Sequence, residues 1–289
     1  MKAADVRYEP YDYLTFIYFF LLTFILLFFG GLEYRIITNL VLISLLVILS
    51  MLIIRNFHKE QHGIRAFIRM TYPLLLITFI YEQVGQFINI IHPGFFDYQI
   101  IKFEEAIFGN NPTILLQQIS HPLLNEFFHL CYFSYFFLLL VLGIHLFLRR
   151  EYAVIDKTVT ASTIAYYVSY ITFILYPVEG PRLAFAGQYS MKLDGFLFVP
   201  LSNFVINSAG LHGGCMPSSH VAVALVTVLI SRKYAPKLYP YYLILTSGLL
   251  IGTFWGRFHY VSDAVAGAIL GFLAVWISEW IYSKLWTNS

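Results

Sequence analysis

The chain has 289 residues, of which 59% are hydrophobic and only 12% are charged. A formal net charge of +2, without a long Lys/Arg block, argues against a nucleic-acid-binding protein, and the hydrophobic content indicates a polytopic membrane protein. Two cysteines are too few for a disulfide framework. We expect no bridge between them, because Cys131 lies in an apolar run and Cys215 in a polar turn.

Apolar runs of about 17 to 25 residues, long enough to cross a bilayer as helices, recur along the chain. The first is too long for a signal peptide and is expected to be a retained span. The fold class predicted from these runs is all-α, a polytopic transmembrane helical bundle of about eight spans. The predicted spans cover residues 13–29, 35–54, 70–91, 126–148, 158–176, 220–230, 241–255 and 261–281.

Polar residues interrupt this pattern in three places. The third predicted span carries Glu82, Gln83 and Gln86, which are costly in lipid and are therefore expected to face the bundle interior. Residues 92–125 alternate short amphipathic pieces with Pro, Gly and Asn, and we expect them to lie along the membrane surface. Residues 177–214 are rich in breakers and are expected to form a folded loop outside the hydrocarbon.

The distribution of basic residues predicts the orientation of the bundle. With eight spans, 13 of the 18 Lys and Arg residues fall on one side, and cytoplasmic loops carry such an excess. Both termini are therefore expected in the cytoplasm. The loops that hold Arg182, His220 and His259 are expected on the extracytoplasmic or lumenal face.

The segment GGCMPSSHVAVAL, residues 213–225, joins a polar turn to an apolar helix. Pro217 suits the first helical position, and Ser218, Ser219 and His220 then fall where backbone N–H groups have no partner within the helix. These donors and the positive end of the helix dipole are typical of a phosphate-binding site.

The segment GRFHYVSDAVAG places His259 and Asp263 four residues apart at the start of another apolar run. One helical face can carry both side chains, and an imidazole oriented by a carboxylate is a usable nucleophile or base. The alternative is an ordinary pair of side chains on a helix surface.

Three blocks together resemble the type 2 phosphatidic acid phosphatase (PAP2) superfamily of membrane lipid phosphatases and phosphotransferases. They are Arg182 in YPVEGPR, His220 in MPSSH, and His259 with Asp263 in HYVSD, in the order that the family has them. The resemblance covers the chain from Thr158 to the C-terminus.

The sequence also departs from the family pattern. Leu175 and Thr253 stand where the family usually has two cations that bind phosphate, and Ser219 replaces a glycine. Arg257 and, as an alternative, Lys192 in the long loop are candidates to supply part of the missing charge. The depleted pattern is similar to the inositol phosphorylceramide synthase-like branch, whose members transfer a phospho-headgroup to a lipid alcohol instead of water.

The resemblance implies a role for each matching residue. His259 would attack phosphorus and form a phosphohistidine, Asp263 would orient its ring, and His220 would protonate the leaving oxygen. The phosphate itself would be bound without a metal ion or other cofactor, because positive charge would come from Arg182, the helix end and the imidazoles. The expected phosphate-binding residues are Arg182, Ser218, Ser219 and Arg257.

These inferences combine into one prediction with two alternatives. Residues 1–156 are expected to form N-terminal transmembrane and interfacial helices, and residues 157–289 the catalytic core of a metal-independent phosphatase or phosphotransferase acting on a phospholipid or polyprenyl phosphate. The first alternative is a headgroup transferase. The second is a non-catalytic lipid transporter or binding protein, in which Glu82, Gln83 and Gln86 would bind the substrate.

Overall fold

The described part of the chain folds as a bundle of long helices closed at one end by short ones. The computed structural model describes residues 7–30, 34–59 and 63–286. Within these ranges there is no strand, and one isolated bridge joins Val178 to Gly214. The long helices are α1 (Pro10–Phe29), α2 (Tyr34–Asn56), α3 (Gly63–Phe87), α6 (Pro122–Leu148), α7 (Tyr152–Leu175), α10 (Ser219–Tyr234), α11 (Tyr239–Trp255) and α12 (Val261–Lys284). The short ones are α4 (Asp97–Phe108), α5 (Pro112–Leu116), the 3₁₀ turn η2 (Gln117–Ile119), α8 (Pro181–Ala184) and α9 (Phe198–Ala209).

The all-α multi-pass architecture predicted from the sequence is confirmed. A long helix occupies each of the predicted spans, and six of them are long and apolar enough to cross a membrane: α1, α2, α3, α6, α7 and α12. Helices α10 and α11 have 16 and 17 residues, which is short for a crossing on their own. The third helix begins earlier than expected, at Gly63, and ends at Phe87, because Asn89 has a positive φ of 67° that a helix does not allow.

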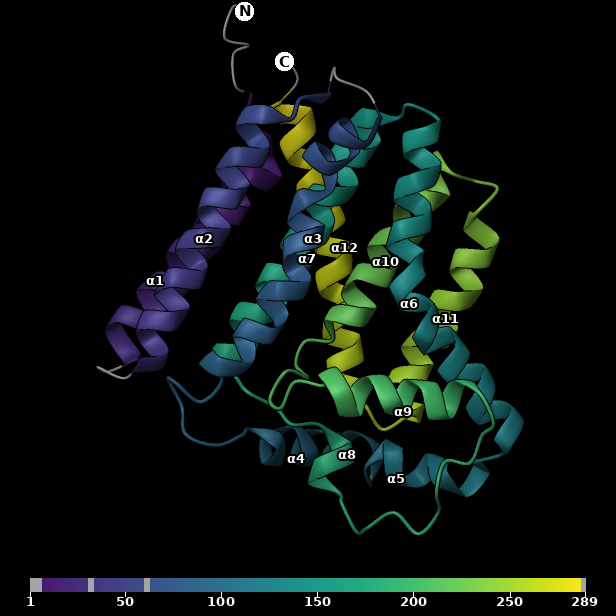
Figure 1. Ribbon diagram of the computed structural model, residues 1–289. Coiled ribbons are helices and arrows are strands. Elements are labelled where there is room, and N and C mark those ends of the chain that lie inside the picture. Colours follow the sequence, from purple (N-terminus) through teal and green to yellow (C-terminus); the bar gives the residue numbers. More distant parts are fainter. Residues whose placement is uncertain (1–6, 31–33, 60–62, 287–289) are drawn as a thin grey trace, which may run out of the picture.

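The two ends of the bundle differ in construction (Figure 1). Helix α1 begins and α12 ends at the same end, whereas α4, α5, α8 and α9 lie across the opposite end. Helices α10 and α12 both begin at that opposite end, so the short helices cover the segment that carries the predicted catalytic residues.

Small residues bring α10 and α12 close together. A Cβ atom at Gly267 would lie 2.4 Å from the carbonyl oxygen of Ser218, and one at Gly271 would lie 2.4 Å from that of Ala222. Only glycine allows so close an approach of one backbone to the other. The starts of the two helices are therefore held side by side.

Charged residues join the helices at the end where α1 begins. Lys59 bridges Glu9 and Asp156, with N···O distances of 2.7 and 2.5 Å. Arg69 pairs with the buried carboxylate of Asp12 at 2.6 Å. Because an unpaired buried charge is costly, these pairs fix α1 against α3 and α7.

The expectation for the polar residues of α3 is wrong in two of three cases. Gln83 is buried, but Glu82 and Gln86 are exposed on the outside of the helix. Gln86 accepts a hydrogen bond from Asn39 of α2, 3.0 Å away, because a neighbouring helix can satisfy a polar side chain as well as the bundle interior can. An intramembrane substrate site built on all three residues has no support from this arrangement.

Candidate active site

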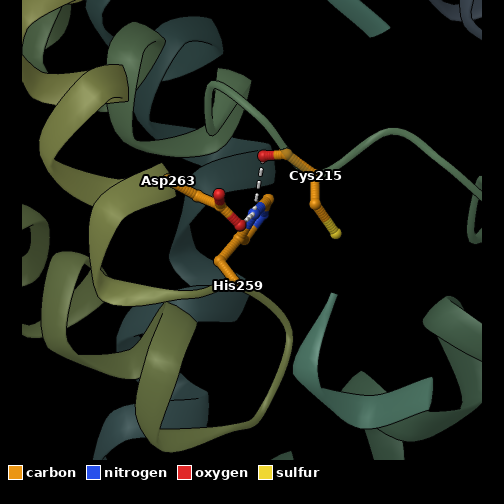
Figure 2. A group of neighbouring side chains, drawn as sticks. All are labelled: Cys215, His259 and Asp263. Atoms are coloured by element: carbon orange, nitrogen blue, oxygen red, sulfur yellow. Dashed lines mark hydrogen bonds and ion pairs between the residues drawn. The ribbon is translucent and has the colours of Figure 1, made fainter. Parts of the chain in front are cut away.

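His259 lies in the turn just before α12 and is 5% exposed. Figure 2 shows its ring between Asp263 and Cys215. Its Nδ1 atom is 3.0 Å from the carbonyl oxygen of Cys215 and 3.6 Å from Oδ2 of Asp263. Both neighbours are acceptors, so Nδ1 carries the proton and Nε2 keeps a lone pair. This is the tautomer that a nucleophilic imidazole needs.

Asp263 is held by the start of its own helix. Its Oδ2 accepts the backbone N–H of Tyr260 at 2.9 Å, which closes a capping box at the N-terminus of α12. The carboxylate is fully buried. The helix start therefore fixes the carboxylate that faces the His259 ring.

His220 projects from the first turn of α10 beside His259. The two ring centroids are 5.9 Å apart at an interplanar angle of 60°. The Nε2 atom of His220 lies 3.3 Å from the hydroxyl oxygen of Tyr132. The ring centroids of His220 and Tyr135 are 4.4 Å apart. The Nδ1 atom of His220 is buried and has no hydrogen-bond partner among the described residues. One polar atom of this ring is thus left for a ligand.

Arg182 belongs to the short helix α8. Of its two terminal guanidinium nitrogens, one donates a hydrogen bond and the other has no partner among the described residues. Its Nη2 donates to Oδ1 of Asn207 on α9 at 2.9 Å. Its Nη1 is buried without a partner in the described part of the chain. Gly180, two residues before Arg182, packs against Cys215 and Phe258, so the turn that carries Arg182 lies beside those that precede His220 and His259. The three predicted blocks therefore converge on one place.

Ser218 and Ser219 form the turn that starts α10. The Ser218 side chain caps the helix by accepting from Val221 N–H at 3.4 Å, and its own N–H donates to the Asp263 carbonyl at 3.0 Å. The backbone N–H groups of Ser219 and His220, by contrast, have no acceptor among the described residues. Those two donors are the free ones at this helix end.

Arg257 is engaged elsewhere. Its Nη2 donates to the carbonyl of Met191 at 2.7 Å, and its guanidinium stacks on Tyr189 at 3.8 Å from the ring centroid. No contact with either histidine is found in the described ranges, so Arg257 joins the long loop to the turn after α11. Its role in binding phosphate stays a prediction.

A carboxylate that the sequence did not predict joins two of the turns that carry predicted site residues. Asp97, the first residue of α4, accepts the N–H groups of Glu179 and Gly180 at 2.8 and 2.9 Å and the hydroxyl of Tyr260 at 2.9 Å. Gly180 lies two residues before Arg182, and Tyr260 directly follows His259. Asp97 therefore ties the turn that carries Arg182 to the turn that carries His259.

Glu104, also on α4, supports the start of α12. Its Oε1 accepts the N–H and the hydroxyl of Ser262 at 2.8 and 3.0 Å, and its Oε2 accepts from Asn111 at 2.9 Å. One signal in the sequence hints at these roles, since a carboxylate opens α4 in a segment otherwise rich in Pro, Gly and Asn. Most hydrogen-bond partners of Asp97 and Glu104 lie 82 or more residues further along the chain, so the spacing of residues in the sequence does not predict these contacts.

Gly180 is where the three turns meet. It has a φ of +98°, and a Cβ atom there would lie 2.6 Å from Sγ of Cys215 and 3.1 Å from the carbonyl oxygen of Phe258. A side chain would therefore be strained by its conformation and would clash as well. The Arg182, Cys215 and His259 turns pack together only because this residue is glycine.

One group of side chains has the composition of a metal site. Cys215, His259 and Asp263 bring one ligand atom each within 4.8 Å of one another (Figure 2). The thiol of Cys215, however, donates to the carbonyls of Glu179 and Phe258 at 3.0 and 3.4 Å, and burial raises its pKa well above the usual value. A metal needs the thiolate, so these donors fit a hydrogen-bonded histidine better than a bound cation.

Comparison with known proteins adds one finding. A protein-family model described as the PAP2 superfamily matches residues 98–277. The match begins well before Thr158 and thus includes most of α4 and all of α6, which carry Glu104 and Tyr132. Searches of curated proteins and of solved structures give no significant match.

Proposed function

The chain belongs to the PAP2 superfamily, and we propose that it is an integral membrane phosphatase or phosphotransferase acting on a phospholipid or polyprenyl phosphate through a phosphohistidine. The family indicates a phosphatase-type activity. The observation that carries the proposal is the state of His259, whose Nδ1 faces two acceptors and whose Nε2 is left as the nucleophile.

In the first step, Nε2 of His259 attacks phosphorus, a P–N bond forms and the P–O bond to the lipid alcohol breaks. His220 gives a proton to the departing oxygen, which supports departure of a poor alkoxide. Arg182 Nη1 and the free N–H groups of Ser219 and His220 are donors suited to the phosphoryl oxygens. Asp263 stabilises the positive charge that develops on the His259 ring.

In the second step, water or a lipid alcohol attacks the phosphohistidine. His220, now neutral, takes the proton from the attacking oxygen, and the P–N bond breaks to restore His259. All positive charge in this scheme comes from side chains and a helix N-terminus, so no metal ion takes part.

A phospho-headgroup transferase is the second candidate. This candidate is supported by the surroundings of Leu175 and Thr253, the two positions where the family usually has a cation that binds phosphate. Leu175 is 47% exposed at the end of α7, and Thr253 is buried, with its carbonyl oxygen accepting the N–H groups of Phe258 and His259 at 2.9 and 3.0 Å. A site with fewer cations suits a phosphate that carries less negative charge, such as a diester or a pyrophosphate.

We propose further that the site faces the extracytoplasmic or lumenal side and that both termini are cytoplasmic. The excess of Lys and Arg in the loops at the other end of the bundle supports this orientation. The substrate would then be bound from the outer leaflet.

Turnover by the purified protein tests the proposal. Phosphate release and headgroup transfer would be measured on a panel of phosphatidate, prenyl phosphates, pyrophosphates and phosphoinositides, with ceramide or diacylglycerol as acceptors. We expect His259→Ala to abolish all turnover and His212→Ala, which removes an imidazole that is 71% exposed, to leave it unchanged. Equal activity of both variants would refute the proposal.

A further inference from the structure

A cavity of about 400 Å³ extends from the candidate active site into the bundle. His220 and Ser219 line it near the site, and the rest is lined by side chains of α3, α6 and α7, by Val205 and Ile206 of α9, and by Gly210. His259 is not part of its lining. Two of its tyrosine hydroxyls, on Tyr135 and Tyr166, bond to each other at 2.5 Å, so the wall that they form is less polar than their composition suggests.

The cavity is long and runs parallel to the helices. On α6 its lining extends from Tyr132 to Leu146, which at 1.5 Å per residue is roughly 21 Å. At the far end lies Phe67, whose ring packs on Phe147 with centroids 5.1 Å apart. Ile155 lines the same end and precedes Asp156, which is paired with Lys59. The apolar lining thus ends at Phe67 and Ile155.

The positions of the two histidines decide which part of a substrate the cavity receives. In an in-line displacement the attacking nitrogen and the leaving oxygen lie on opposite sides of phosphorus. If His259 attacks, the leaving oxygen lies toward His220, and His220 is the histidine that lines the cavity. The group attached to that oxygen therefore extends into an apolar space.

We propose that this cavity binds the hydrocarbon chain of the leaving alcohol and limits its length, so that the substrate class is the phosphate ester of a long-chain lipid alcohol. The inference rests on the proposed function. A chain about as long as the cavity fills it, and a longer one extends past Phe67 and Ile155, where the apolar lining ends.

Gly143 offers a place to shorten the cavity. It lines the wall on α6, and a Cβ atom there would meet nothing within 4 Å. It lies about 12 Å along α6 from Tyr135, which packs on His220. Gly143→Phe would fill the deep half, while Val141→Phe is a matched control on the same helix, because Val141 is 46% exposed on its outer face.

The test compares kcat/KM for hexyl and hexadecyl phosphate in the same detergent. An extended hexyl chain is roughly 8 Å long and ends before Gly143, whereas a hexadecyl chain is roughly 20 Å long, given carbon–carbon bonds of about 1.5 Å. We expect Gly143→Phe to lower kcat/KM for hexadecyl phosphate by about tenfold, equivalent to about 1.4 kcal/mol, and to leave that for hexyl phosphate unchanged. Gly143→Leu should give a smaller loss in the same direction, and Val141→Phe none.

The outcomes separate this inference from the proposed function. Wild-type protein that cleaves neither ester would refute both. If the wild-type protein is active but its ratio of kcat/KM for hexadecyl phosphate to kcat/KM for hexyl phosphate equals that of Gly143→Phe and Gly143→Leu, the cavity assignment alone is refuted. Equal losses on both esters would do the same, because they would mean a general structural effect.

Discussion

The backbone N–H of Ser218 donates to the backbone carbonyl oxygen of Asp263, with nitrogen and oxygen 3.0 Å apart. This bond joins the cap of α10 to the first turn of α12. It uses no side-chain atom, so the spacing between the start of α10 and the Asp263 carboxylate depends on how closely the two backbones approach. Gly267 sets that approach.

Gly267→Ala should therefore reduce both stability and activity. The added Cβ would lie 2.4 Å from the Ser218 carbonyl oxygen, and such overpacking costs about 1–3 kcal/mol. Thermal unfolding in detergent and phosphate release would measure the two effects. Gly143→Ala is the control for the unfolding measurement, because its Cβ has no neighbour within 4 Å. Similar behaviour of the two variants would contradict the importance of this contact.

Asp97→Asn should lower kcat more than it lowers the folded fraction. Asparagine keeps the size of the side chain but turns one acceptor oxygen into a donor, which would then face N–H or O–H groups that also donate. Misplacing a catalytic group by about 1 Å can reduce the rate by roughly 10²-fold. Kinetics and unfolding of the same preparation provide the measurement.

Glu105→Gln is the matched control for Asp97→Asn. Glu105 lies on the same helix but pairs only with the exposed Lys102 among its described contacts, at 2.8 Å. An exposed ion pair contributes little, so activity should stay at the wild-type level. If both variants lose activity to the same degree, Asp97 has no special part in holding the site.

The two histidines should differ in their response to the leaving group. His220→Ala removes the acid, so cleavage of a lipid ester should fall by roughly 10²–10⁴-fold while cleavage of p-nitrophenyl phosphate, whose leaving group needs no proton, falls far less. His259→Ala should abolish both and leave no covalent phosphoenzyme. Rapid quench with labelled substrate would detect the intermediate. A phosphoenzyme in His259→Ala that is missing from His220→Ala would reverse the two roles.

Vanadate should inhibit turnover, and chelators should not. Vanadate takes up the trigonal-bipyramidal geometry of the transferring phosphoryl group, and the donors of Arg182, Ser219 and His220 suit it. Initial rates with vanadate and with EDTA are the measurement. Loss of activity in EDTA that magnesium restores would show that a cation holds the phosphate.

Surface labelling should place the loop at residue 190 outside the cell. Ser190→Cys should react with an impermeant thiol reagent in intact cells, and Pro236→Cys should react only after lysis. Both residues are exposed, and the α8–α9 and α10–α11 loops that hold them lie at opposite ends of the bundle (Figure 1). The natural cysteines are buried and give little background. Glu60, also expected on the protected side, lies outside the described residues. The reverse labelling would put the site in the cytoplasm.

The sequence predicted the parts of the site that depend on local structure. His220 and His259 could be found because each stands where an apolar helix begins, and a helix start has free donors whatever surrounds it. Tyr132, Asp97 and Glu104 could not, because their partners lie on other helices and contacts between helices leave no fixed spacing in the chain. Glu82 was misplaced for the same reason, since hydropathy alone does not say which face of α3 is covered.

The hydrogen bonds of Asp97 and Glu104 bear on how this protein could be recombined with its relatives. The division after residue 156 that the sequence predicts would leave both carboxylates on one fragment and the turns that they hold on the other. A chimera joined there would pair α4 with foreign turns whose backbone donors need not match. Exchange of substrate specificity between family members would keep the turns of Arg182 and His259 supported only if the transferred segment starts before Asp97.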